Sequence, residues 1–258
     1  MTHEEKVSRW LREPGVEIGA FRTPIMGVNS VYIDRFKEYA GQPCLFDYLG
    51  DATQLPIKDN SINYVATSHV LEHVANPILA LKEWCRVLRH GGIIYMVVPD
   101  KRFTWDRNRG TTSVAHMIED YEKGTPVSDP THIDDFVDNI VWSEFSPSTP
   151  PDRVQIERDA QKSGYWHAVN NKQEINIHFH VFDPESIKEL VGTLRNYDPE
   201  TFDWELVDFA ERFPFSNPNG ILCVIRVKKS FGQRLSHALA RPFRRGSHWF
   251  VKKDAGTV

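Results

Sequence analysis

The side chains of this sequence that are best suited to proton transfer are histidines and carboxylates at short spacings. They form three closely spaced pairs: His69 and His73, His116 and Asp120, and His178 and His180. Histidine suits a general base because its pKa lies near neutral pH. A histidine and a carboxylate four residues apart share one helix face, where the carboxylate can orient the ring. We therefore expect base chemistry from these candidate catalytic residues: His69, His116, Asp120 and His178.

Two of the pairs also have a structural interpretation. For His73, packing or helix capping is favoured over catalysis, whereas His69 directly follows a predicted strand and is better placed. His178 and His180 alternate in a predicted strand, so their side chains would point the same way or form only a contact at a strand edge. The base role therefore falls first to His69.

A metal site is a further interpretation of the same residues. His116, His178 and His180 could join Asp120 in supplying imidazole and carboxylate ligands. No zinc-type spacing accompanies them in the local sequence. We therefore predict no metal site, and we keep metal binding as a minority alternative.

A glycine and two carboxylates lie where predicted strands end. Gly19 closes a run that begins at residue 15, Asp34 ends the next strand, and Asp51 follows the third. In an open α/β sheet the carboxyl ends of parallel strands form one edge, where ligands bind. A carboxylate there can accept hydrogen bonds from ribose hydroxyls or an adenine amino group. Singly, each acid is more often a turn former, so their serial placement carries this prediction.

These side chains depend on an alternation of strands and helices. Predicted strands cover residues 15–20, 30–34, 44–48, 62–68, 93–98, 204–209 and 221–227. A helix over 77–88 is predicted to end with Gly91 and Gly92 as its C-cap, and a second helix begins after the N-cap Asp183. The last two strands are joined by a short polar connection, which indicates an antiparallel hairpin. Together the pattern predicts an α/β fold with a central parallel strand at 93–98.

Residues 100–182 follow no sheet period. Three tryptophans in this stretch argue against disorder: Trp105, Trp142 and Trp166. A helix is predicted over 112–122. We expect the segment to form a cap over the carboxyl edge of the sheet, since long irregular stretches in compact domains are usually functional.

Six motifs, in this order, resemble the class I methyltransferases of the type 11 group, which use S-adenosyl-L-methionine. They are Glu-Ile-Gly at 17–19, the strand-end acid Asp34, Gly-Asp-Ala with Leu-Pro at 50–56, Asp-Asn-Ser-Ile-Asn-Tyr-Val at 59–65, Ser-His-Val-Leu-Glu-His-Val at 68–74, and Arg-Val-Leu-Arg with Gly-Gly at 86–92. The resemblance covers residues 13–99, and 183–228 match the end of the same fold. It implies a Rossmann-like sheet of seven strands with an antiparallel last strand, helices on both faces, and a cap insertion.

The resemblance also assigns contacts with the cofactor. It implies that Glu17, Gly19 and Ala20 line the methionine end, that Asp34 holds the ribose, and that Asp51 and Ala52 meet the adenine, with Ser68 and His69 near the sulfonium and Arg35 also in the cofactor site.

The loop after the first strand departs from that pattern. It reads Gly19-Ala20-Phe21-Arg22-Thr23-Pro24, with one glycine where two or three are usual and little room for the first helix. A nicotinamide dinucleotide needs that helix N-terminus for its pyrophosphate, whereas S-adenosyl-L-methionine has no phosphate. An NAD-type oxidoreductase is thereby the disfavoured alternative. A degenerate methyltransferase fold that only binds or regulates stays open as the other.

A narrower resemblance covers residues 98–106 and 177–182, which are similar to bacterial methyltransferases associated with glycan assembly. It implies a hydroxyl of a sugar, glycan or glycolipid as the methyl acceptor, and polysaccharide biosynthesis as the setting. The predicted acceptor-binding residues are Asp100, Arg102, Arg109 and His180. The two arginines would suit a phosphate or carboxylate, or belong to a solvated basic loop.

Composition agrees with an enzyme of the cytoplasm. Of 258 residues 40% are hydrophobic and 26% charged, and no apolar run reaches the roughly 18 residues of a membrane-spanning helix. Cys44, Cys85 and Cys223 fit neither a disulfide framework nor a zinc site, which favours a reducing compartment. Nucleic acid is not expected as a partner, since no Asn-Pro-Pro-Tyr-type motif follows the fourth strand.

The boundaries predict four parts: residues 1–99 and 183–229 as the two halves of the cofactor-binding domain, 100–182 as the cap, and 230–258 as a basic tail. Eight Lys or Arg and no acid lie between Lys228 and Lys253. A basic amphipathic tail can lie on an anionic membrane surface, so peripheral contact with the inner membrane face is possible. A packed terminal helix is the alternative.

Overall fold

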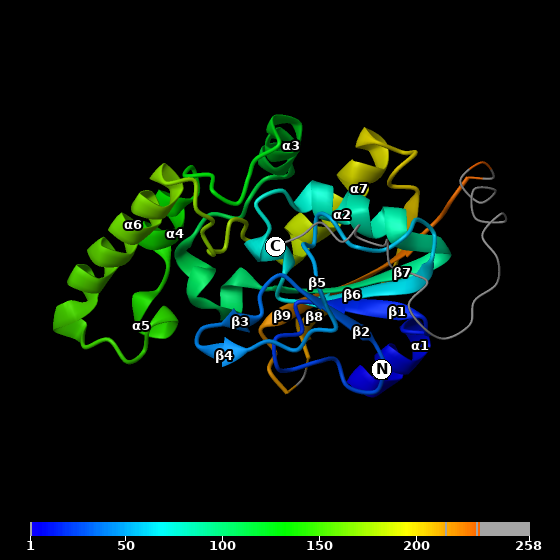
Figure 1. Ribbon diagram of the computed structural model, residues 1–258, viewed down its shortest axis with the longest axis horizontal. Coiled ribbons are helices and arrows are strands. Elements are labelled where there is room, and N and C mark those ends of the chain that lie inside the picture. The colour runs from blue at the N-terminus through cyan, green and yellow to red at the C-terminus, as the bar shows by residue number, and fades with distance from the viewer. Residues whose placement is uncertain (1, 215, 231, 233–258) are drawn as a thin grey trace, which may run out of the picture.

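The computed structural model describes residues 2–214, 216–230 and 232. Figure 1 shows a central sheet with α2 (Pro77–Val87) and α7 (Pro184–Tyr197) on one side and α1 (His3–Trp10) on the other. The cap helices α4 (Ile133–Asn139), α5 (Trp142–Phe145) and α6 (Val154–Asn170) lie together beside the sheet. The predicted basic tail over 230–258 falls outside the described residues, apart from 230 and 232.

Seven strands form one sheet in the order β5-β2-β1-β6-β7-β9-β8. Their bounds are β1 Gly15–Ile18, β2 Val31–Asp34, β5 Tyr48–Leu49, β6 Ile62–Ser68, β7 Leu88–Pro99, β8 Trp204–Phe213 and β9 Gly220–Val227. The strands from β5 to β7 pair in parallel, and β9 runs antiparallel to both of its neighbours. The predicted Rossmann-like methyltransferase sheet with an antiparallel last strand is confirmed.

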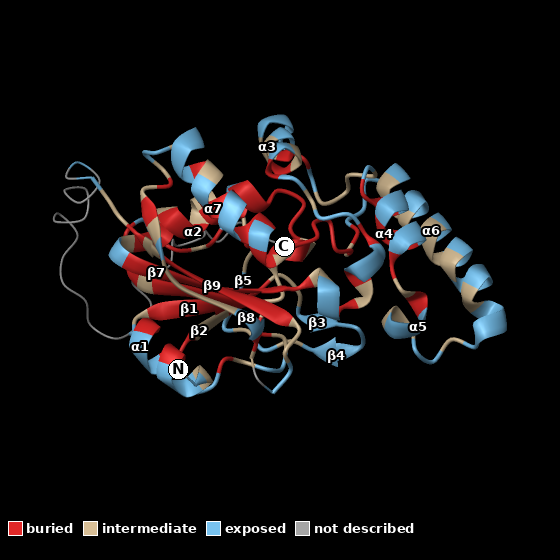
Figure 2. Ribbon diagram, turned by 180° about the vertical axis from the view of Figure 1, so that it is seen from behind, coloured by how far each residue is buried: buried red, intermediate tan, exposed pale blue. Residues whose placement is uncertain are grey.

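Alternate residues of the central strands build two separate cores. On β7, Ile94 and Met96 pack with the apolar faces of α2 and α7. Tyr95 and Val97 point the other way and pack with α1. Because both faces are covered, β6, β7 and β9 read as nearly continuous apolar runs, which is typical of central strands in α/β proteins. Strands β7 and β9 in Figure 2 are correspondingly buried along most of their length.

The two helices over the first face begin where the sequence predicts. Asn76 caps α2 by accepting a hydrogen bond from the Leu79 amide, and Pro77 occupies the first helical position. Asp183 and Ser186 form a capping box at the start of α7. These caps fix the helix starts, so the chain turns sharply away from the sheet edge at both places.

The connection from β1 to β2, residues 19–30, contains no helix. The short loop predicted from the sequence, with little room for the usual first helix, is confirmed. The opposite face is covered instead by α1, whose Lys6 ammonium lies 2.6 Å from Asp208 on β8. Trp10 donates to the same carboxylate at 2.9 Å. A helix from before the first strand therefore supplies much of the cover on that face.

Three local predictions are wrong. The third strand is β5 at Tyr48–Leu49, not residues 44–48, because it is a short edge strand with exposed side chains that give little period. Gly91 and Gly92 lie inside β7 and do not cap α2, whose C-cap is the extended Leu88. The segment around His178 and His180 is not a strand, since its backbone bonds go to the turn after β6 and not to a sheet neighbour.

The cap has its own apolar cluster. After β7 come the short helices η2 (Lys101–Phe103) and η3 (Trp105–Asn108), and then α3 (Val114–Lys123), which overlaps the predicted helix over 112–122. Phe136 and Val137 of α4 pack with Trp142 of α5 and Phe179. By contrast α6 has no fully buried residue, and Figure 2 shows its outer surface exposed. Through this cluster, residues 175–179 pack against α4 and α5.

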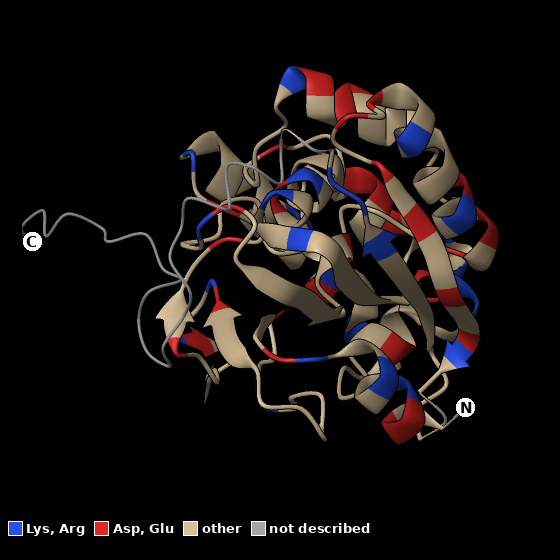
Figure 3. Cartoon of the chain, turned by 90° about the vertical axis from the view of Figure 1, so that its right-hand side faces the viewer, with Lys and Arg blue, Asp and Glu red and all other residues tan. Residues whose placement is uncertain are grey.

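Charged residues of both signs are interspersed over the visible helices in Figure 3.

A separate two-stranded hairpin, β3 (Glu38–Tyr39) with β4 (Gln42–Pro43), turns through Ala40 and Gly41, both with positive φ. Every helix in the part of the chain that the structure describes is too short or too polar to cross a membrane.

Two glycines give a test of this packing. A Cβ at Gly15 would lie 2.3 Å from the Tyr64 ring, whereas a Cβ at Gly164 in α6 meets nothing within 4 Å. We expect Gly15→Ala to destabilise the fold by about 1–3 kcal/mol through overpacking. Gly164→Ala should stabilise it by about 0.5–1 kcal/mol, because Ala restricts the unfolded chain. Thermal unfolding of both variants checks this, and equal shifts in Tm would contradict the packing described.

Candidate active site

The loop after β1 is held by contacts at its start and at its middle. Both carboxylate oxygens of the buried Glu17 accept from the Ile25 amide, at 3.0 and 3.1 Å. Burial raises the pKa of Glu17 to about 7, although that hydrogen bond opposes the shift. Gly19 has φ +67°, and a Cβ there would lie 2.6 Å from Val70 Cγ2. Only glycine therefore lets this loop lie against the turn that follows β6.

Asp34 lies at the end of β2, where the sequence places it. The residue is buried, and its Oδ1 accepts from the Phe36 amide at 2.9 Å. Burial raises the pKa of Asp34, and the amides of Phe36, Phe21 and Arg35 reduce that shift without cancelling it. A shielded carboxylate at this edge is a strong acceptor for hydroxyl donors.

Asp51 follows β5 and forms a local turn. Its Oδ1 accepts from the Thr53 amide at 2.8 Å and from the Thr53 hydroxyl at 2.6 Å. Arg35 Nη1 lies 3.3 Å from Asp51 Oδ2, and the same guanidinium pairs with Glu174 of the cap. Arg35 therefore links the carboxyl ends of β2 and β5 to the cap. Ala52 is buried beside it, and its carbonyl accepts from Trp84 Nε1.

The turn after β6 brings His69 to the same edge. Ser68 ends the strand, and His69 takes a left-handed φ of +55° while its amide donates to the Val97 carbonyl. Its Nδ1 lies 3.5 Å from Oε1 of Glu72, a side chain with no exposed surface in η1 (Leu71–His73). The imidazole itself remains 35% exposed. His69 is therefore accessible on one side and oriented by a buried carboxylate on the other.

The two groups shift each other's pKa in consistent directions. Burial lowers the pKa of His69, but the interaction with Glu72 outweighs burial and the net pKa is raised. Burial raises the pKa of Glu72, yet the neighbouring imidazoles of His69, His73 and His178 lower it below its ordinary value. Glu72 therefore stays ionised although it is buried.

A second layer lies behind Glu72. His73 Nε2 is 4.0 Å from Glu72 Oε1, and the rings of His73 and His178 meet edge to face with centroids 4.6 Å apart. His178 Nδ1 lies 2.5 Å from Asp106 Oδ2, whose other oxygen lies 2.8 Å from Arg109 Nη1. Burial and the charge of His178 lower the pKa of His73 to about 4. The four-residue spacing of His69 and His73 would place them on one face of an α-helix, but His73 instead ends the short 3-10 helix η1, and both rings lie near the Glu72 carboxylate.

The other predicted pair lies in the cap. His116 Nε2 is 3.3 Å from Asp120 Oδ2 on α3, as the four-residue spacing indicates. His132 and His180 lie against the same carboxylate, each at 3.8 Å. His178 and His180 therefore belong to different clusters, which the prediction of a shared direction did not foresee.

The predicted acceptor-binding residues are paired within the protein. Asp100 is buried and holds Arg102 through Nε and Nη2, and Arg102 also pairs with Glu211. Arg109 has no exposed side-chain surface and pairs with Asp106 and Asp135. As acceptor contacts, Asp100, Arg102, Arg109 and His180 stay predictions.

Three residues of these clusters were missed from the sequence: Glu72, Asp106 and His132. Glu72 follows His69 by three residues, which is a usable signal. Asp106 lies two residues after Thr104, whose hydroxyl accepts from its amide, but no spacing relates it to His178. For His132 the sequence carries no local signal, because its partners come from other segments.

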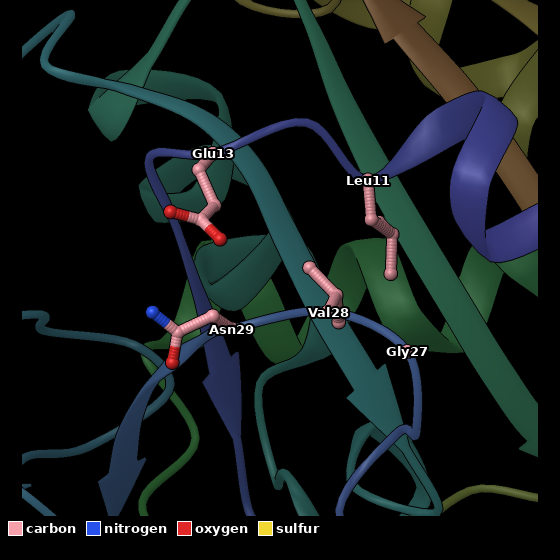
Figure 4. A pocket seen from close by; sticks show the side chains of 5 residues that line it. All are labelled: Leu11, Glu13, Gly27, Val28 and Asn29. Carbon is pink, nitrogen blue, oxygen red and sulfur yellow. The ribbon is translucent and has the colours of Figure 1, made fainter.

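A pocket of about 610 Å³ lies elsewhere, lined by Leu11, Glu13, Gly27, Val28 and Asn29 (Figure 4). Glu13 and Asn29 precede β1 and β2, so this pocket is at the amino ends of these strands. Ligands of open α/β sheets bind at the carboxyl ends. The chemistry of Glu17, Asp34 and His69 is at that opposite edge, and we assign the pocket no part in it.

Parts of this chain are similar in sequence to known proteins. Residues 26–96 match the model of a family described as a methyltransferase domain. A 37.1 kDa protein of transposon TN4556 from Streptomyces fradiae is 37% identical over 102 residues, 36% of this chain and 28% of that protein. A demethylmenaquinone methyltransferase of Staphylococcus aureus is 47% identical over 45 residues, 17% of this chain and 19% of that protein. The chain thus spans less than a third of the length of these relatives.

Among solved structures, a SAM-dependent methyltransferase of Thermotoga maritima, described as a possible histamine N-methyltransferase, is similar at 16% identity and a TM-score of 0.43, over 88% of each chain.

The residues at the carboxyl edge fit S-adenosyl-L-methionine. Asp34 holds a shielded carboxylate where the ribose is expected, and Gly19 begins the loop after β1 with a residue that has no side chain. No helix N-terminus follows β1 to bind a pyrophosphate, within the described residues 19–30. The family match over residues 26–96 and the sheet order support S-adenosyl-L-methionine as the cofactor.

Asp34 gives the direct test of this edge. We expect Asp34→Asn to weaken binding of S-adenosylhomocysteine about 10-fold or more, because a hydrogen bond to a charged group contributes about 1.5–3 kcal/mol. Isothermal titration measures the affinity, and Asp152→Asn in the exposed cap turn is the matched control. Equal affinity in the two variants, or tighter binding of NAD than of S-adenosylhomocysteine, would contradict the assignment.

Proposed function

We propose that this chain is an O-methyltransferase that moves the methyl group of S-adenosyl-L-methionine to a hydroxyl of a small polar acceptor. The observation that carries the proposal is the pair of His69 and Glu72 at the carboxyl end of β6. A general base requires an imidazole that is partly exposed, with one ring nitrogen facing a buried carboxylate and the other available to take a proton. Amine or sulfur acceptors need such a base less.

The bound cofactor supplies a methyl group on a positively charged sulfur, which a hydroxyl oxygen can attack as its proton leaves. His69 Nδ1 faces Glu72, so Nε2 lies on the side of the ring away from that carboxylate. Nε2 therefore takes the hydroxyl proton and later releases it to solvent. Glu72 holds the ring in this orientation and stabilises the imidazolium that forms.

His69 is preferred over the two other histidines around Glu72. His73 is exposed to a similar extent, at 31%, but its pKa of about 4 makes it a poor base. His178 is buried and bound to Asp106. The pKa of His69 is raised, because the interaction with Glu72 outweighs burial, which makes its imidazole a stronger base than that of His73.

The sugar class of acceptor is the finer part of the proposal. It is supported by the resemblance of residues 98–106 and 177–182, both of which border this site: Trp105 lies 5.3 Å from the His178 ring, centroid to centroid. The Phe179 and His180 amides donate to the Glu72 carbonyl, so the second segment packs directly on η1. A glycan or glycolipid acceptor would therefore contact the cap at residues 98–106 and 177–182.

Transfer of radiolabelled methyl from S-adenosyl-L-methionine tests the function. The full chain is offered methyl glycosides and nucleotide sugars, with histamine and a hydroquinone as probes of other acceptor classes. We expect label in an alkali-stable sugar ether. Label confined to the amine or the hydroquinone would contradict the acceptor class. Cofactor binding with no transfer to any probe would favour the binding or regulatory alternative.

In the same assay, His69→Gln should lower kcat by about 10²–10⁴-fold, the usual contribution of a general base. His167→Gln on exposed α6 is the control and should leave kcat unchanged. Affinity for S-adenosylhomocysteine should remain measurable in both variants, which separates loss of the base from loss of the fold.

A further inference from the structure

Four side chains from three separate segments converge in the cap. His116 and Asp120 come from α3, His132 is the residue before α4, and His180 comes from the extended stretch before α7. One ligand atom of each lies within 4.8 Å of all the others. We propose that these four side chains bind one divalent transition-metal ion of the Zn²⁺ class. The sequence alone predicts no metal here, and its minority alternative placed His178 where the structure places His132.

The spacing of the atoms is that of ligands around a common centre. Nε2 of His116 and Nε2 of His132 are 2.9 Å apart, and Asp120 Oδ2 lies 3.3 Å from the first and 3.8 Å from the second. His180 Nε2 is 3.8 Å from the same oxygen. A tetrahedral ion with bonds of 2.0–2.1 Å keeps its ligand atoms about 3.3 Å apart. The four groups therefore need only small adjustments to bind one ion.

Hydrogen bonding within the cluster leaves buried polar atoms unsatisfied. Asp120 Oδ2 is buried and accepts no hydrogen bond, and His180 Nδ1 has no partner either. The two Nε2 atoms of His116 and His132 can share one proton at most. His180 Nε2 lies 3.3 Å from the Ala75 carbonyl, a bond that it would exchange for the ion. An unsatisfied buried carboxylate is costly, and a cation would remove that cost.

The groups behind the ligands orient them toward the centre. Thr125 donates its hydroxyl to Asp120 Oδ1 at 2.9 Å, which leaves Oδ2 facing the imidazoles. The Thr131 hydroxyl lies 3.1 Å from His132 Nδ1, so Nε2 of that ring points into the cluster. Asn76 donates to the Asp120 carbonyl and ties α3 to the start of α2. Metal-binding imidazoles and carboxylates are commonly held in this way by outer partners.

The ligand types select the metal and its role. Three imidazoles with one carboxylate suit Zn²⁺, Co²⁺ or Ni²⁺ better than Mg²⁺ or Ca²⁺, which prefer oxygen. Four protein ligands leave no open position, which is typical of a structural site. The His116 side chain is 41% exposed, while those of Asp120 and His132 are 6% and 7% exposed. An ion would therefore enter past His116 and be enclosed by the others.

Such an ion would hold the cap on the sheet edge. His180 follows the Phe179 amide that donates to the Glu72 carbonyl, so fixing His180 also fixes the wall beside Glu72. The neighbouring cluster of Glu72, His73 and His178 is also compact. There, however, His178 is already bound to Asp106. The inference concerns metal binding alone and does not depend on methyl transfer.

Metal content of the full, tag-free chain tests the proposal. After dialysis against EDTA and reconstitution with Zn²⁺, we expect about one ion per chain by mass spectrometry. Reconstitution with Co²⁺ should give the visible absorption of a tetrahedral site. Chelation should lower Tm, and Zn²⁺ should restore it.

Variants locate the ion. His132→Gln should abolish Zn²⁺ retention, and His116→Gln should weaken affinity at least 10-fold. His116 is half-exposed, so its substitution should leave the fold intact, which circular dichroism checks. Thr125→Val should weaken affinity about 10- to 100-fold through Asp120. His167→Gln is the control and should retain the ion. No Zn²⁺ or Co²⁺ on the wild-type chain, or retention in both ligand variants, would overturn the proposal.

Discussion

The carboxylate of Glu72 is the constraint around which this site is arranged. It has no exposed surface, yet the surrounding imidazoles keep its pKa below the ordinary value. Burying a charge costs several kcal/mol unless partners compensate it. The imidazoles of His69, His73 and His178 lie near Glu72 and provide that compensation. His69 and His73 are both partly exposed, at 35% and 31%, but only His69 combines this exposure with a raised pKa, because its interaction with Glu72 outweighs burial.

The sheet brings these groups together without the usual first helix. The loop after β1 is held by Glu17 and lies against Val70, directly before the turn that carries Glu72. The cap then closes the other side, since the backbone of residues 179–180 bonds to the Glu72 carbonyl. The cofactor edge and the candidate base therefore share one structural support. A second cluster, of His116, His132 and His180 around Asp120, lies within the cap. It adjoins that contact, because the His180 amide also donates to the Glu72 carbonyl.

Sequence patterns predicted the parts of this structure that depend on local order. Strands β6 and β7 and the starts of α2 and α7 follow from apolar runs and caps, and the strand-end acids followed from the order of the strands. The edge strand β5 was misplaced because two exposed residues carry no period. Residues 178–180 imitate the alternation of a strand, while tertiary contacts send the two histidines into different clusters. His132 joins Asp120 only through the fold of the cap, and no spacing could have indicated it.

The most direct test of the central claim is an NMR titration of the His69 imidazole in the chain bound to S-adenosylhomocysteine. We expect a pKa above the ordinary value of about 6.5, because the interaction with Glu72 outweighs burial. We also expect Glu72→Gln to lower this pKa. A His69 pKa at or below the ordinary value, unaffected by Glu72→Gln, would contradict the claim that Glu72 prepares His69 as the base.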